Sequence, residues 1–192
     1  MERYKARLVA KGFTRTYGLD YEETFAPLAR LPTVRTLIAL AALRQWKLFQ
    51  MDVKNAFLNG DLSEEVYMQP PPGYPHQAGQ VCRLRKALYG LKQAPRAWFY
   101  KLKHALFEWG FSNSTFDISL FHCRKDGKLL MLLVYVDDIL VTENSISFIG
   151  KFIVDLFYRF SIKDLGALYF FSWDQSDCHA RLIISHSTQI HS

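Results

Sequence analysis

The sequence predicts an α+β fold in which helices and antiparallel hairpins alternate within one globular domain. Three segments show the apolar spacing of amphipathic helices, and another contains two long apolar runs separated by a pair of aspartates. Hydrophobic residues make up 49% and charged residues 22% of the 192 residues, so the chain can bury a core and is not an extended disordered protein. This length suits a single domain.

The first half of the chain predicts a helix, an extended segment and a loop. The helix is expected over residues 33–46, where apolar side chains recur every three or four residues and Thr33 can cap the N-terminus. Residues 46–52 mix apolar and polar side chains as a strand does, and an Asn-Gly turn follows at 59–60. Residues 69–80 include three consecutive prolines, which exclude both a helix and a central strand, so a loop is expected there.

Two further helices are expected in the second half of the chain. One spans residues 95–109, because it begins at a proline, carries an apolar stripe that includes Trp98 and Leu102, and is followed by Gly110 as a stop signal. The other spans residues 145–160 and has a similar apolar stripe, so we expect both helices to pack one face against a core.

Hairpins are expected around and after the paired aspartates. The apolar runs of residues 129–142 predict a buried β-hairpin with its two acids at or near the turn. Residues 163–166, with the sequence KDLG, are expected to form a turn. Two short strands, over about 167–173 and 181–185, are expected to pair as a second hairpin.

Positive charge is concentrated in two stretches. The chain has 24 Lys and Arg against 18 Asp and Glu, a net charge of +6. Residues 66–107 contain seven cations and no acid, and residues 1–15 contain five cations and one acid, so all other residues together carry a net charge of −5. Two basic stretches on an acidic body suit a protein that binds a phosphate backbone. A solvated helix face, which carries lysine and arginine in the same way, is the alternative.

Disulfide, zinc and membrane sites are not expected. The three cysteines are far apart in the sequence and form no Cys-x-x-Cys pair, so neither a disulfide framework nor a structural zinc site is predicted. The N-terminal residues lack the apolar run of a signal peptide. The longest apolar run, at residues 129–136, is far shorter than the ~20 residues that span a membrane, so no membrane partner is expected.

Asp137 and Asp138 are the most unusual feature of the sequence, because they interrupt an otherwise apolar hairpin. Two carboxylates about 4 Å apart repel each other by roughly 4 kcal/mol at an effective dielectric constant of ~20. A raised pKa, a cationic neighbour or a divalent metal must offset this repulsion. An ordinary hairpin turn is the alternative, since aspartate is common in turns.

Asp52 adds a third carboxylate at the end of the extended segment 46–52. If this segment and the hairpin are neighbouring strands of one sheet, Asp52 can meet the acidic pair. Carboxylate oxygens are hard ligands that suit Mg²⁺, which commonly takes one or two carboxylates together with phosphate oxygens. Two such ions can activate an attacking hydroxyl and stabilise a leaving pyrophosphate.

Five segments, in this order, resemble the reverse transcriptase of copia-type LTR retrotransposons, a class of transposable element. They are RYKARLVAKGF (3–13), DYEETFAPLARLPTVRTLIALAA (20–42), QMDVKNAFLNGDLSEEVYMQPPPGY (50–74), VCRLRKALYGLKQAPRAWF (81–99) and LLVYVDDILVT (132–142). The resemblance extends from residue 2 to about residue 186. It is specific, because a lone Asp-Asp pair is a weak signal whereas these blocks in this order are distinctive.

The resemblance implies an antiparallel polymerase palm with packed helices and part of the fingers of a right-hand polymerase, without a thumb. It implies one reverse transcriptase domain over residues 1–192, with fingers at about 1–45 and 60–95 and palm at about 46–59 and 96–186. The implied activity is RNA-directed DNA polymerisation, in which a primer 3′-hydroxyl attacks the α-phosphate of a deoxynucleotide. The implied partners are deoxynucleotides, an RNA or DNA template-primer and two Mg²⁺ or Mn²⁺ ions. The implied location is the cytoplasm, in a virus-like particle, or the nucleus.

The resemblance also implies roles for particular residues. Asp52 and Asp137 match the principal metal ligands, and Asp138 lies beside them at the end of the Tyr-Val-Asp-Asp box. The carbonyl of Val53 is a further implied ligand. The implied nucleotide-binding residues are Lys5, Arg7, Asn55, Ala56, Phe57, Tyr89 and Gly90, of which Phe57 is the ring that excludes a 2′-hydroxyl. The implied nucleic-acid-binding residues are Arg83, Lys92 and Arg96.

The sequence also departs from the family pattern. The first fingers strands and the thumb are not in the sequence, Ser172-Trp173 stands where the family has Leu-Gly, and Glu143 replaces a glycine. Trp173 is expected to obstruct the primer terminus, and Glu143 to add a third negative charge near the acidic pair and to remove a hinge. We therefore expect a truncated copy with impaired activity. One alternative is a non-catalytic nucleic-acid-binding remnant. Another is a palm-like nucleotidyl transferase or cyclase outside retroelements, although the fingers and basic segments argue against it.

Overall fold

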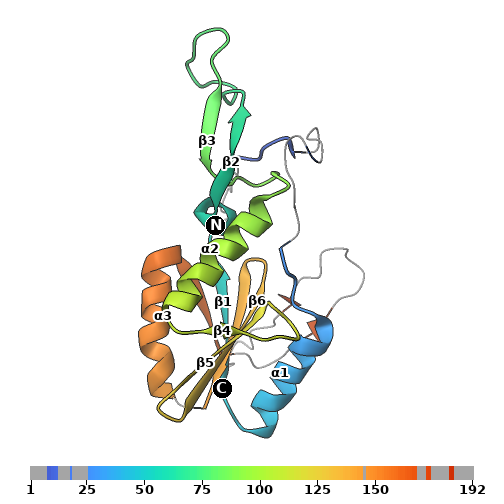
Figure 1. Ribbon diagram of the computed structural model, residues 1–192, viewed down its shortest axis with the longest axis vertical. Helices are drawn as coiled ribbons and strands as arrows, with labels where there is room; N and C mark the ends of the chain where they lie inside the picture. The colour runs from blue at the N-terminus through green and yellow to red at the C-terminus, as the bar shows by residue number, and fades with distance from the viewer. Residues whose placement is uncertain are drawn as a thin grey trace, which may run out of the picture. The chain divides into compact units, whose positions relative to one another are not determined.

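The computed structural model describes most of the chain as two compact units. The described residues are 8–12, 18, 26–144, 146–167, 172–173 and 182–183. The hairpin unit comprises Met1–Pro27 with Asn55–Trp109, and the sheet unit comprises Leu28–Lys54 with Gly110–Ser192. Figure 1 shows β2, β3 and α2 of the hairpin unit and α1, β1, β6 and α3 of the sheet unit. Helices and antiparallel strands are mixed along the chain, which confirms the predicted α+β class.

The sheet unit is built on six strands in the order β4-β5-β6-β7-β1-β8, and each neighbouring pair is antiparallel. Their bounds are β1 Leu48–Val53, β4 Ser112–Asn113, β5 Leu120–Lys125, β6 Lys128–Tyr135, β7 Asp138–Glu143 and β8 Ile162–Ala167. Strands β6 and β7 form the hairpin expected over residues 129–142. The extended segment expected at 46–52 is β1, which lies between β7 and β8.

Both faces of the central strands are buried. Helix α1 (Leu31–Leu43) places Val34 and Leu37 in one apolar cluster with Leu48, Leu133 and Leu140 of the sheet. The next residues along β6, Leu132 and Val134, point to the other face because strand side chains alternate, and they are no more than 1% exposed. Helix α3 (Ile146–Phe160) contacts β6, β7 and β8, and it matches the helix predicted at 145–160.

The start of α1 corrects one prediction. Arg30 is the N-cap and makes no side-chain capping bond, so Thr33 does not cap the helix. The Thr33 hydroxyl instead donates to Asp117 Oδ2 at 2.6 Å, and the Arg30 N–H donates to the same oxygen at 3.0 Å. Asp117 is only 6% exposed and also accepts the N–H of Ser119 at 3.0 Å. A distant carboxylate therefore binds the Thr33 hydroxyl and the Arg30 N–H at the start of α1.

The hairpin unit joins a two-stranded sheet to a helix. Its elements are the 3₁₀ helix η2 (Ala56–Asn59), β2 (Asp61–Met68), β3 (Cys82–Lys86) and α2 (Ala94–Glu108). The Pro-rich residues between β2 and β3 form the predicted loop, and α2 matches the helix predicted at 95–109, with Gly110 at φ +87° behind it. A Cβ on Gly60 would lie 2.7 Å from the backbone nitrogen of Trp98, so only glycine lets α2 approach this closely.

The end of the sheet unit corrects a second prediction. Residues 163–166 were expected to form a turn, but they lie within β8 and pair with β1. The register shifts between Gln50 and Met51, so an extra residue bulges out of β8 and the polar segment stays in the ladder. Strand β9 (Ser172–Trp173) pairs with β10 (Leu182–Ile183), as expected for the second hairpin. Of the other residues in the two predicted strands, residue 167 belongs to β8 and the rest lie outside the described residues. Among the described residues, no helix is long and apolar enough to cross a bilayer.

Candidate functional site

Asp52 and Asp138 lie directly opposite each other on neighbouring strands of the sheet unit. The β1–β7 register pairs Asp52 with Asp138, and the β6–β7 register pairs Tyr135 with Asp138. Directly opposed residues of an antiparallel pair project from the same face, so both carboxylates leave the sheet on one side. Asp52 could meet the acidic pair only if β1 and the hairpin were neighbouring strands, and they are.

A two-residue turn, Val136-Asp137, connects β6 to β7 and places Asp137 beside this pair. The Asp137 carbonyl accepts the Val53 N–H at 2.9 Å, which ties the turn to the end of β1. Val136 has φ +56°, a left-handed conformation that β-branched residues rarely adopt. Such strain costs on the order of 1–3 kcal/mol and persists only where the surroundings impose it. The turn is therefore held in one shape, with both aspartates at the strand end.

Asp138 lies in an environment that disfavours its charged form. Its pKa is raised to about 6, chiefly because burial disfavours the charged carboxylate. A hydrogen bond from Gln50 opposes this shift, and the negative charges of Asp137 and Asp52 add to it. Gln50 Nε2 donates to Asp138 Oδ1 at 3.1 Å. The carboxylates of Asp137 and Asp52 therefore both lie within electrostatic reach of Asp138.

The donor chemistry of this acidic site fits a hard divalent cation. Carboxylate oxygens are the ligands that Mg²⁺ and Mn²⁺ prefer, and the mutual repulsion seen at Asp138 is what a cation would relieve. The side chains are not gathered around a single point, because the described parts of the chain contain no group of three or more His, Cys, Asp or Glu arranged to hold a metal. Asp52, Asp137 and Asp138 would have to turn toward a common centre.

The described candidate nucleotide-binding residues lie in the hairpin unit, and the rings of two of them are in contact. The rings of Phe57 and Tyr89 have centroids 4.7 Å apart at an interplanar angle of 52°. Asn55 precedes η2 in a left-handed conformation (φ +53°), and Ala56 is fully buried at the start of that helix. The structure therefore brings Phe57 and Tyr89 together, although they are far apart in the sequence.

Gly90 allows the backbone of Ala10 to lie close to the segment that carries Tyr89. It has φ +89°, and a Cβ there would lie 2.0 Å from the Ala10 carbonyl oxygen. The Ala10 N–H donates to the Tyr89 carbonyl at 2.7 Å, and Val9 forms a parallel bridge with Tyr89. Residues 8–12 are thus fastened to the Tyr89-Gly90 segment. Lys5 and Arg7 lie outside the described residues.

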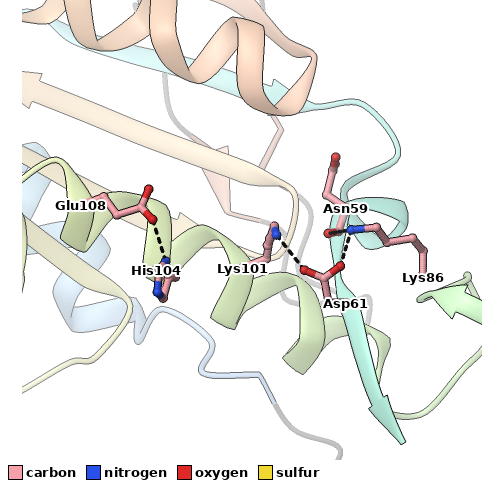
Figure 2. Close-up of polar contacts among 6 residues, drawn as sticks. All are labelled: Asn59, Asp61, Lys86, Lys101, His104 and Glu108. Atoms are coloured by element: carbon pink, nitrogen blue, oxygen red, sulfur yellow. Dashed lines mark hydrogen bonds and ion pairs between the residues drawn. The ribbon is translucent and has the colours of Figure 1, made fainter. Parts of the chain in front are cut away.

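The basic stretch 66–107 is partly neutralised by acids that precede it. Arg83 forms an ion pair with Glu65 at 2.8 Å. Figure 2 shows Lys86 and Lys101 both directed at the carboxylate of Asp61, with Lys101 Nζ at 2.7 Å. The hydrogen bonds that Lys101 and Lys86 donate to this carboxylate lower the pKa of Asp61, and the bond from Lys101 has the larger effect. These ion pairs were not predicted from the sequence, because the acids of β2 reach the cations of β3 and α2 only in the folded hairpin unit.

The remaining cations of the stretch lie on or before α2. The Arg96 guanidinium lies 5.4 Å from the centroid of the Tyr100 ring, and Lys103 Nζ lies 5.2 Å from that of Phe107. Tyr100 is 52% exposed and Phe107 is 46% exposed. Lys92 is exposed before the helix begins. Of the three predicted nucleic-acid contacts, Lys92 and Arg96 thus lie at the N-terminal end of α2, and Arg83 is held by Glu65.

The structure places Glu143, but not the side chains of Ser172 and Trp173, among the residues that depart from the family pattern. Glu143 is the last residue of β7 and pairs with Leu130, whereas Asp138 is the first residue. An offset of five residues puts Glu143 on the opposite face of the sheet at the far end of the strand, where it is 4% exposed. The expectation that Glu143 adds charge beside the acidic pair was therefore wrong, while the expected loss of a hinge stays a prediction. Ser172 and Trp173 form β9, and their side chains lie outside the described residues.

Comparisons with known proteins agree on one family. The family model described as reverse transcriptase (RNA-dependent DNA polymerase) matches residues 1–176. The Pol polyprotein of transposon RE1 from Arabidopsis thaliana is 47% identical over 173 residues, which is 89% of this chain and 12% of that protein. The Pol polyprotein of transposon TNT 1-94 from Nicotiana tabacum is 42% identical over 168 residues, 85% of this chain and 13% of that protein.

More distant relatives extend to yeast. A putative transposon Ty5-1 protein of Saccharomyces cerevisiae is 36% identical over 119 residues, 60% of this chain and 38% of that protein. No solved structure matches the chain significantly. The chain spans about an eighth of the length of the plant polyproteins it matches.

Proposed function

Because the chain belongs to the reverse transcriptase (RNA-dependent DNA polymerase) family of copia-type retrotransposon polyproteins, we propose that it adds deoxynucleotides to a primer 3′-hydroxyl. The observation that supports this most is the register that sets Asp52 opposite Asp138, with Asp137 in the adjoining turn. We assign these acids to the palm of a right-hand polymerase, with the fingers supplied in part by the hairpin unit. The substrates are deoxynucleotides and an RNA or DNA template-primer.

Asp52 and Asp137, with Asp138 beside them and the Val53 carbonyl, are the residues that would hold two Mg²⁺ or Mn²⁺ ions. When bound, such ions lower the pKa of an attacking hydroxyl and stabilise the leaving pyrophosphate. The chain itself supplies positioning, since the bond from Val53 N–H to the Asp137 carbonyl and the Asp52–Asp138 pairing fix both strand ends. Correct positioning of reacting groups is a large share of phosphoryl-transfer catalysis.

The hairpin unit would bind the nucleotide and its template. We assign to Phe57 the exclusion of a ribose 2′-hydroxyl. The Tyr89 ring, whose centroid lies 4.7 Å from that of Phe57, would keep the Phe57 ring in place. Asn55 and Ala56 would offer backbone N–H groups to the triphosphate, and Lys5 and Arg7 would approach it with positive charge. Gly90 would line the nucleotide pocket beside Tyr89 and leave room for the Ala10 carbonyl. Lys92 and Arg96 would contact the phosphate backbone of the template-primer, with Arg83 shared between that backbone and Glu65.

Primer extension on an RNA template tests this proposal. The purified chain should extend a DNA primer in the presence of Mg²⁺ or Mn²⁺, and Asp137→Asn should lower the rate by about 100-fold or more, because several kcal/mol of charge stabilisation is lost. The matched control is Asp126→Asn in the exposed β5–β6 turn, where φ is +51° and asparagine is tolerated. It should extend normally.

The same experiment separates the proposal from its alternative. A chain that binds template-primer in a salt-dependent manner but incorporates no nucleotide with either metal would contradict polymerase activity. That result would identify a non-catalytic nucleic-acid-binding remnant instead. Equal rates of primer extension by the wild type and Asp137→Asn would mean that the acidic site takes no part in catalysis.

A further inference from the structure

Gln50 is a buried glutamine on the same face of the sheet as the acidic site. It lies two residues before Asp52 on β1 and pairs with Leu140, which lies two residues after Asp138 on β7. Side chains two residues apart on a strand share a face, so Gln50 lies diagonally across from Asp138. Its side chain is 4% exposed, and its Nε2 donates to Asp138 Oδ1 at 3.1 Å.

The surroundings of Gln50 make an amide there costly. Its strand neighbours on this face, Leu48 and Leu140, belong to the apolar cluster under α1. The Gln50 Oε1 atom is buried and accepts no hydrogen bond from the described residues. An apolar side chain would avoid that unsatisfied oxygen, so packing alone does not account for a glutamine. Turning the amide over would set its oxygen against the carboxylate, two acceptors facing each other.

A neutral donor at this position has a particular effect on the acids. A lysine or arginine would pair with Asp138 and cancel the negative charge that attracts a cation. The amide of Gln50 restrains the carboxylate and leaves its charge in place. This bond occupies one Asp138 oxygen, so Asp138 has one carboxylate oxygen fewer to offer to a metal ion.

We propose that Gln50 is a positioning residue, which holds one carboxylate oxygen of Asp138 so that divalent ions are bound chiefly by Asp52 and Asp137. The proposal rests on the metal-binding part of the proposed function. Residues that hydrogen-bond a metal ligand from outside the metal's own shell typically contribute 10- to 100-fold in affinity or activity. Gln50 acts on the site only through Asp138, which makes its effect conditional on that carboxylate.

Mn²⁺ binding to the full chain, without primer or nucleotide, tests the proposal apart from polymerase activity. The fraction of free Mn²⁺ in a titration is read from its electron paramagnetic resonance signal. Gln50→Met keeps the length of the side chain but cannot donate, and it should weaken Mn²⁺ binding by about 10-fold. Gln93→Met is the matched control, because Gln93 is also a buried glutamine, 3% exposed, and lies in the hairpin unit. It should leave Mn²⁺ binding unchanged.

A double-mutant comparison separates positioning from a general loss of structure. In an Asp138→Asn background, Gln50→Met should have no further effect on Mn²⁺ binding, because the bond it removes has lost its charged partner. If Gln50→Met does not fold, as judged by circular dichroism, Gln50→Asn serves in its place, since its shorter side chain cannot reach Asp138. The half-saturating Mg²⁺ concentration for primer extension should rise in parallel with the Mn²⁺ dissociation constant.

Three results would overturn the positioning role. The first is Mn²⁺ binding by Gln50→Met that equals that of the wild type. The second is an equal loss in the wild-type and Asp138→Asn backgrounds, which would mean that Gln50 supports the fold generally. The third is a wild-type chain that binds no Mn²⁺. Failure of primer extension with Mn²⁺ binding intact would count against the polymerase proposal alone.

Discussion

Asp52 and Asp138 face each other across β1 and β7, and a hydrogen bond from Gln50 holds the second of them. The antiparallel register, rather than proximity in sequence, creates this pair. The adjoining turn is fixed by the Val53–Asp137 backbone bond, so all three acids belong to one strand end of the sheet unit.

Phe57→Val should weaken discrimination against ribonucleotides. The Phe57 ring is backed by Tyr89 at 4.7 Å, so it cannot easily retreat from a 2′-hydroxyl, whereas valine leaves space. We expect the ratio of kcat/KM for a deoxynucleotide to that for the matching ribonucleotide to fall by about 10- to 100-fold. Phe116→Val, at an 87% exposed phenylalanine of the sheet unit, should not change this ratio. An unchanged ratio in Phe57→Val would remove Phe57 from nucleotide selection.

Lys92→Gln should reduce the salt dependence of template-primer binding more than Arg83→Gln does. A cation that contacts a phosphate contributes roughly one unit to the slope of log Kobs against log salt concentration. Arg83 already has a carboxylate partner, Glu65, at 2.8 Å, whereas the Lys92 side chain is exposed just before α2 begins. Fluorescence anisotropy of a labelled template-primer across a KCl series measures both slopes. Equal slopes for the two variants would contradict the ranking.

Asp117→Asn should destabilise the sheet unit at neutral pH and much less in acid. Burial alone would raise the pKa of Asp117, but hydrogen bonds from Ser119, Thr33 and Arg30 outweigh it and hold that pKa below the ordinary value. The stabilisation by the native carboxylate is therefore present above the unfolded pKa of about 4 and is lost as pH falls through the lower native pKa. We expect a loss of about 1–3 kcal/mol in the free energy of unfolding at pH 7.

Urea denaturation at pH 7 and pH 3 measures this difference. The difference in unfolding free energy between wild type and Asp117→Asn should narrow at pH 3, because the Asp117 carboxylate of the unfolded chain is largely protonated there and part of the linked stabilisation is lost. Asp126→Asn, an exposed acid in the same unit, should show no comparable loss at either pH. A gap of the same size at both pH values would mean that the charge of Asp117 does not matter.

Local patterns predicted most of the elements that position the candidate site. The apolar runs around residues 137 and 138 specified the β6–β7 hairpin, and the 3.6-residue period specified α2 and α3. These features are local, so they are visible in a short window of sequence. The adjacency of β1 and β7 was only a condition in the sequence analysis, because strand order depends on the whole sheet.

The errors came from long-range contacts and from strand direction. Thr33 was expected to cap its own helix, but Asp117, on a distant loop, takes its hydroxyl. The turn expected at 163–166 is a strand because β1 supplies its ladder partners across a bulge. The misplacement of Glu143 was avoidable, since an odd offset from Asp138 along a strand already predicts the opposite face. Gln50 was missed, although its even offset from Asp52 signalled a shared face.

Single-nucleotide incorporation by the wild type and by Asp52→Asn, across a range of Mg²⁺ concentrations, measures whether the acidic site carries the metal-dependent reaction. The acidic site predicts metal-dependent incorporation by the wild type and a loss of at least about 100-fold in Asp52→Asn that added Mg²⁺ does not restore. Asp126→Asn should match the wild type. Metal-dependent incorporation at the wild-type rate by Asp52→Asn would contradict the account.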